Sequence, residues 1–204
     1  MTKKVVFVIF VILAISVGFY PLRYILVGGD IGVLDSKPAD LLSNSFYKAA
    51  FYTHILVGGL ALLAGWSQFS GSIRKKYLQL HRRLGIFYSL CVLFSGLAGV
   101  YIGFFATGGL ITSIGFILLG LVWLSSTSIA FYAIKNKDIR THQKWMIVSY
   151  AACFAAVTLR LWLPLLIVTF GEFLTAYKIV SWLCWVPNMI VAYFIIKNKG
   201  LLHT

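Results

Sequence analysis

The chain alternates between six long apolar runs and short polar segments. The runs cover about residues 5–27, 49–70, 83–105, 110–134, 145–170 and 175–197. Each run reaches the roughly 20 residues that an α-helix needs to cross the hydrocarbon core of a bilayer. The pattern predicts an all-α integral membrane bundle of six transmembrane helices, organised as one transmembrane domain over residues 1–204.

The first apolar run follows a short basic start and precedes the longest polar segment. A signal peptide begins in a similar way, but the run over 5–27 is too long and lacks a small-x-small cleavage site before Tyr20-Pro21. We therefore expect a first transmembrane helix with its N-terminus inside the cell. Residues 28–48 are expected to form an external loop with a short surface helix near Pro38–Leu42.

Composition and charge support a membrane location. Of the 204 residues, 60% are hydrophobic and 11% are charged, whereas soluble domains contain about 25% charged residues. Most of the 18 Lys and Arg residues lie near the two termini and in segments 74–83 and 135–144. Such clustering in short loops is typical of the cytoplasmic side. It predicts a multi-pass protein of the bacterial cytoplasmic (inner) membrane with both termini inside. A net charge of +13 placed in this way does not indicate a nucleic-acid partner.

Small and polar residues recur at helical spacing in three of the runs. Gly58 lies one turn after His54, and Gly85 lies one turn after His81. One face of the fifth run carries His142, Met146, Ser149, Cys153, Ala156 and Arg160. Small residues let membrane helices approach closely, which explains most of these stripes. The cysteines lie inside apolar runs without a CxxC pair, so we expect them to act as small apolar residues.

Of the ionisable residues in the predicted spans, two lie well away from the span ends. His54 is about five residues into the second helix, and Arg160 is about ten residues from the outer end of the fifth. Such groups usually face the bundle interior or a wet cavity. We therefore treat His54 and Arg160 as an intramembrane polar site. The alternative is that Arg160 pairs with an outer acid (Asp30, Asp35 or Glu172) or extends outward to the interface.

His81 and His142 stand at the cytoplasmic starts of the third and fifth predicted helices. Two histidines at matching depth on different helices can serve as axial ligands of a haem iron. Gly85 would leave room for a flat macrocycle. The alternative is that both histidines contact lipid head groups among the neighbouring Lys and Arg residues. In the sixth run, Pro187 followed by Asn188 predicts a kink that turns Asn188 towards the bundle.

Three segments carry a resemblance to a known family: HILVGGLALLAGWSQF, HRRLGIFY with the following SGLAG, and THQKWMIVSYAACFAAVTLRLWLP. They resemble the bacterial predicted membrane proteins of domain of unknown function number 2306, over roughly residues 50–165. The motif positions are His54, His81, Arg82, Gly85, His142, Trp145, Met146 and Arg160. Gln143 stands where a second basic residue is expected. The resemblance implies a multi-pass membrane protein.

The layout also has a looser similarity to cytochrome b561-type bundles, which hold haem between helix pairs. Those bundles use two histidine pairs, but the fourth run has no histidine to match His54. The similarity therefore implies at most one bis-histidine haem b, held by His81 and His142.

Three functions are compatible with these residues. The first is a redox module in which one haem b exchanges electrons with a membrane quinone. The second is a non-redox transporter of a small anion or of protons, which uses His54 and Arg160. The third is an accessory subunit that packs on a membrane protein partner. The sequence contains no HExxH zinc motif and no nucleophile–base pair, so hydrolytic chemistry is not indicated.

Overall fold

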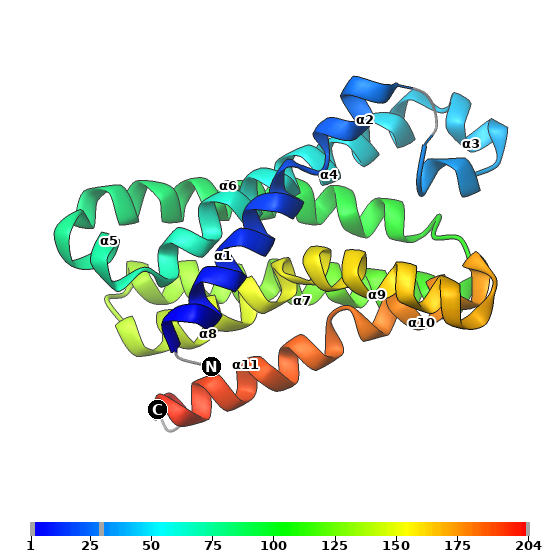
Figure 1. The fold of residues 1–204 in the computed structure, drawn as a ribbon. Helices are drawn as coiled ribbons and strands as arrows, with labels where there is room; N and C mark the ends of the chain where they lie inside the picture. Colours follow the sequence, from blue (N-terminus) through cyan, green and yellow to red (C-terminus); the bar gives the residue numbers. More distant parts are fainter. Residues whose placement is uncertain (1–2, 29–30, 203–204) are drawn as a thin grey trace. The chain divides into compact units, whose positions relative to one another are not determined.

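The structure, a computed structural model, describes residues 3–28 and 31–202, and within these ranges it contains helices and turns but no strands (Figure 1). Six helical spans in the described part are long and apolar enough to cross a membrane. They are Lys4–Val27, Ser45–Phe69, Leu78–Gly103, Leu110–Lys135, Ile139–Phe170 and Phe173–Asn198. The predicted all-α fold with six membrane helices is confirmed. The direction of each helix across the membrane and the single-domain organisation stay predictions.

The chain divides into two compact units, one up to Ser95 and one from Gly96 onward, and each is described by itself. The helices of the first unit are α1 (Lys3–Phe19), α2 (Leu22–Val27), η1 (Leu34–Ser36), α3 (Ala39–Ser43), α4 (Ser45–Gly65), η2 (Trp66–Phe69), α5 (Gly71–Lys76) and the first part of α6 (Leu78–Gly103). α3 confirms the short helix expected near Pro38–Leu42. α4 begins where the side chain of Asn44 accepts hydrogen bonds from the N–H groups of Phe46 and Tyr47 at 2.9 and 3.1 Å.

A pair of glycines brings α1 and α4 together. A Cβ atom placed on Gly59 would lie 2.6 Å from the carbonyl oxygen of Gly18, and one placed on Gly18 would lie 2.7 Å from the Leu63 side chain. The Gly18 backbone cannot give way without moving the helix, so position 59 requires glycine, whereas a side chain at position 18 would have to displace Leu63. This close approach is a common way for membrane helices to associate.

The second unit begins within α6 and contains five more helices. They are α7 (Leu110–Lys135), α8 (Ile139–Cys153), α9 (Ala155–Phe170), α10 (Phe173–Leu183) and α11 (Val186–Asn198). Asp138 caps α8 by accepting a hydrogen bond from the Thr141 N–H at 3.0 Å. Hydrogen bonds from Thr141 hold the pKa of the Asp138 carboxyl below its usual value, because they stabilise the ionised form.

The fifth and sixth predicted spans are each built from two helices. The sixth changes direction between α10 and α11 (Figure 1), which confirms the expected kink. The break falls at Cys184 and Trp185, just before Pro187, because proline lacks an N–H and its ring collides with the carbonyl four residues earlier. The break of the fifth span at Phe154 is not predicted by the sequence. There the N–H groups of Val157 and Thr158 both bond the Phe154 carbonyl, at 2.9 and 3.1 Å.

Candidate functional site

His54 joins α4 to α6 through reciprocal hydrogen bonds with Ser95. Nδ1 of His54 lies 2.9 Å from the Ser95 carbonyl oxygen, and the Ser95 hydroxyl donates to the His54 carbonyl at 2.9 Å. Because a carbonyl oxygen can only accept, Nδ1 carries the proton and Nε2 is the basic nitrogen. Gly58 makes the contact possible, since a Cβ atom there would lie 2.9 Å from the Ser95 hydroxyl. His54 is therefore an interhelical tie with a defined tautomer.

His81 lies in the first turn of α6, where its N–H donates to the Tyr77 carbonyl at 3.0 Å. Its side chain is half-buried, whereas that of Arg82 is exposed. The space beside Gly85, one turn further on, faces the side chain of Gln68: a Cβ atom on Gly85 would lie 3.3 Å from Oε1 of that amide. A flat group could enter beside Gly85 only if the Gln68 amide moved.

His142 lies in the first turn of α8 and is tied to α7. Its Nδ1 lies 2.9 Å from the Ala130 carbonyl oxygen, so Nδ1 again carries the proton and Nε2 is the basic nitrogen. The side chains of His142, Trp145 and Met146 are half-buried. Two turns deeper, the Ser149 and Thr127 hydroxyls, both buried, lie 2.6 Å apart. The polar face expected for the fifth run is thus turned towards α7 over its first half.

Arg160 lies in α9, the second half of the fifth span, and its side chain is half-buried. Its Nη1 donates to the Ala156 carbonyl, one turn earlier in the same helix, at 2.8 Å. Glu172 is the N-cap residue directly before α10, and it accepts a hydrogen bond from the Thr175 hydroxyl. Asp30 lies outside the described residues. The pairing of Arg160 with an acid stays a prediction.

Asn188 connects the two helix breaks of the second unit. Its Nδ2 lies 3.2 Å from the Ala151 carbonyl, 3.1 Å from the Thr158 hydroxyl and 3.0 Å from the Cys184 carbonyl. The Thr158 hydroxyl also donates to the Cys184 carbonyl. Carbonyls that lose their helical partners at the breaks are thereby satisfied by side chains, as the apolar surroundings of a membrane span require. The expectation that Asn188 faces the bundle is confirmed.

Thr158 is the site residue that the sequence analysis missed. Its hydroxyl lies within hydrogen-bond distance of the carbonyls of Phe154 and Ala155, at the start of its own helix, and of Cys184, directly after α10, and its single proton can be donated to one of them at a time. A threonine in an apolar helix commonly bonds its own carbonyls, so the residue alone carries no signal. Its role in bonding carbonyls depends on the helix break at Phe154, and no proline or glycine at that position predicts the break.

The described residues contain no cluster of three or more His, Cys, Asp or Glu side chains that could hold a metal ion. A haem iron needs only two axial ligands from the protein, so this observation does not bear on haem. The three cysteines are buried and none is in a disulfide.

Fold and polar contacts together define a multi-pass α-helical membrane protein whose histidines and amides tie helices to one another. The chain matches the family of predicted membrane proteins (DUF2306) over residues 51–196, which is more than half of its 204 residues. It therefore belongs to this family, and the family resemblance is confirmed. Neither the curated proteins nor the solved structures contain a match.

Proposed function

We propose that this membrane protein binds one haem b through His142, with His81 as the second axial ligand predicted from the sequence, and exchanges electrons with a membrane quinone. The observation that supports the proposal is the hydrogen bond from His142 Nδ1 to the Ala130 carbonyl at 2.9 Å. Histidines that ligate metals almost always donate their other ring N–H in this way, which fixes the ring and leaves Nε2 as the ligand atom. The assignment of His81 rests on its place in the first turn of α6.

The residues around this histidine suit an axial ligand. The bond to Ala130 makes the imidazole a stronger donor to iron and holds the ring still. His142 lies only four residues after Asp138, the residue that caps α8, so the start of the helix is also fixed. The haem, when bound, supplies one-electron transfer. His54, whose tautomer is set by Ser95, would take up or release a proton at Nε2.

The test is an optical spectrum of the full-length protein, purified in detergent from haem-replete cells. We expect a Soret band when it is air-oxidised and split visible bands after dithionite reduction. His142→Gly and His81→Gly should each lose the reduced split bands, and added imidazole should restore them where the variant remains folded by size-exclusion chromatography. His54→Ala is the matched control and should keep the spectrum. A colourless wild-type protein would refute the proposal.

A second function, non-redox transport of a small anion or of protons, is favoured by a different observation. The fifth and sixth spans are both interrupted, and Asn188 bridges the interruptions. Interrupted helices near the middle of a membrane are typical of transporter binding sites. Arg160 lies two residues beyond Thr158 in α9. If the protein is a transporter, proteoliposomes that contain it should show anion or proton flux. That flux should fall in the Arg160→Gln variant and persist in protein without haem. Absence of both flux and haem would favour an accessory subunit.

We further propose that the protein lies in the bacterial cytoplasmic membrane with both termini inside. The basic segments support this orientation: Arg74, Lys75 and Lys76 are exposed in α5, as is Arg140 in the first turn of α8. Fusion of alkaline phosphatase to the C-terminus should give an inactive enzyme, whereas fusion within 31–44 should give an active one.

A further inference from the structure

The start of α7 packs closely against α10 within the second unit. A Cβ atom on Gly115 would lie 2.9 Å from the Ser181 carbonyl oxygen, and Trp182 Nε1 donates to the Ile111 carbonyl at 3.2 Å. One turn closer to the start of both helices, Thr112 and Lys178 occupy the equivalent positions. The two helices therefore run in parallel, and the first turn of α7 lies beside Lys178.

Thr112 is a buried hydroxyl for which the described residues offer no hydrogen-bond partner. The residue is completely buried, and its Oγ1 makes no hydrogen bond to any of the described residues. A Cβ atom on Gly108 would lie 2.5 Å from this oxygen and 3.1 Å from Cγ of Lys178. The hydroxyl thus faces the side of Gly108 where a side chain is missing, and the flexible chain of Lys178 covers that position. Such unpaired buried groups are rare and call for a specific explanation.

The same corner presents backbone donors. α7 is 26 residues long, and its N-cap, Gly109, offers no side-chain acceptor. The first helical hydrogen bond of α7 is donated by the Ser113 N–H to the Gly109 carbonyl at 3.1 Å. The N–H groups of residues 110–112 come before it and have no acceptor within the helix. No acidic residue lies in the first turn of α7. The aligned peptide dipoles place a partial positive charge at this end of the helix, and Lys178 adds a full one.

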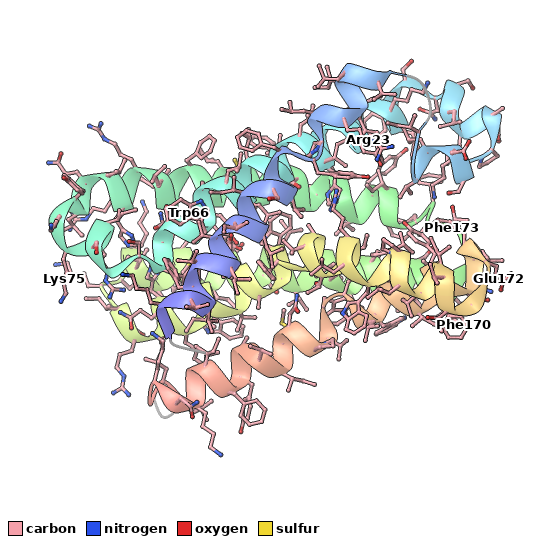
Figure 2. The ribbon with its side chains drawn as sticks, in the orientation of Figure 1. Arg23, Trp66, Lys75, Phe170, Glu172 and Phe173 are labelled. Carbon is pink, nitrogen blue, oxygen red and sulfur yellow. The ribbon has the colours of Figure 1, made fainter. Side chains whose placement is uncertain are left out.

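Glu172 stands at the turn between α9 and α10 (Figure 2), where the Thr175 hydroxyl donates to its carboxylate. It precedes Lys178 by more than one helical turn on the same chain, and its carboxylate is exposed. The described corner around Gly108 therefore combines a hydroxyl, backbone amides and an ammonium group.

We propose that the first turn of α7 binds a phosphate-type oxyanion. Thr112 Oγ1 and the amides of residues 110–112 donate hydrogen bonds to its oxygens, and the Lys178 side chain swings off Gly108 to pair with its charge. A tetrahedral oxyanion has several acceptor oxygens for these donors, and helix N-termini with open amides are established anion sites. Two sources share this chemistry: the phosphate of a phospholipid head group and inorganic phosphate from solution. His81, His142 and the proposed haem take no part in this site.

Full-length protein in dodecyl maltoside tests the proposal in two arms. Native mass spectrometry measures retention of added phosphatidylglycerol, and isothermal titration calorimetry measures binding of inorganic phosphate. Thr112→Val and Lys178→Gln should each lower the affinity for whichever ligand the wild type binds by at least fivefold. Thr169→Val and Lys199→Gln are matched controls that should bind as the wild type does. Thr112→Ser keeps the hydroxyl and should retain binding even if Thr112→Val does not fold.

The two arms separate the sources. If the wild type retains the lipid, the two variants lose it and phosphate gives no heat, the site binds a lipid head group. If the wild type binds phosphate but retains no lipid, the site binds a soluble anion. The proposal is overturned if neither ligand binds to the wild type, or if Thr112→Val and Lys178→Gln bind it as tightly as the control variants do.

Discussion

Replacing Asn188 with leucine should loosen the junction between the two broken spans. Leucine has the same branching at Cγ but donates no hydrogen bond, so the change removes the contacts from Nδ2 to Ala151, Thr158 and Cys184. The Cys184 carbonyl keeps the Thr158 hydroxyl as a donor, whereas the Ala151 carbonyl loses this partner. The penalty should therefore arise mainly at the break in the fifth span.

The size of the effect follows from the geometry. The amide nitrogen has two hydrogens, so at most two of its three contacts are strong at once. Side-chain hydrogen bonds between membrane helices contribute about 0.6 kcal/mol on average and up to about 1.7. An acceptor left unpaired in an apolar interior adds a penalty of about 1–3 kcal/mol. We expect Asn188→Leu to lower the free energy of unfolding by about 1–3 kcal/mol.

Unfolding by SDS titration from mild detergent, followed by circular dichroism, measures this change. Asn198→Leu is the matched control because Asn198 is exposed at the end of α11. Thr158→Val tests whether the two residues act together. Since they share a network, the double variant should lose less stability than the sum of the single losses.

Labelling of Cys184 gives a second measurement. This thiol is completely buried beside the break in the wild type. In Asn188→Leu it should react faster with a small maleimide, because local opening of the junction becomes more frequent. An unchanged unfolding free energy together with an unchanged labelling rate would show that the amide does not hold the two breaks together.

Two further predictions concern the first unit. Gly59→Ala should destabilise the protein by about 1–3 kcal/mol in the same titration, because its new methyl group meets the Gly18 backbone at 2.6 Å. Gly71→Ala, with nothing within 4 Å, should be close to neutral, and equal losses would contradict the packing argument. Burial lowers the pKa of Lys37 to about 8 from its usual 10.5. The unfolded chain therefore binds more protons between these values, and stability should rise with pH across that window. Acylation of Lys37 followed by mass spectrometry should show a midpoint near pH 8 in folded protein and a higher one in denaturant; equal midpoints would contradict the assignment.

The membrane fold was accessible from the sequence because the signal is long and local. A run of about 20 apolar residues has few stable alternatives to a membrane helix, since every backbone polar group must be satisfied within the segment. The kink before Asn188 was also accessible, because Pro187 removes a donor wherever it stands in a helix. Ser125, Ser126 and Thr127 in α7 do bond carbonyls of their own helix, as isolated hydroxyls in an apolar helix are expected to do.

The partners of the polar side chains were decided by the tertiary structure. Helical periodicity placed His54, His142 and Ser149 on particular helix faces. It did not identify their partners, which are the Ser95 carbonyl, the Ala130 carbonyl and the Thr127 hydroxyl. Those contacts depend on the rotation and register of two helices, and both are set by packing over the whole length of each helix.

The same distinction separates the two helix breaks and the candidate sites. By itself the sequence determined six membrane helices, the family and the residues that are polar within apolar runs. Only the tertiary structure decided that the fifth span breaks at Phe154, that Thr158 and Asn188 satisfy the carbonyls there, and that Thr112 is buried beside Lys178. The length of an apolar run is a property of one segment of sequence, whereas a hydrogen bond between helices forms only once two distant segments have packed together.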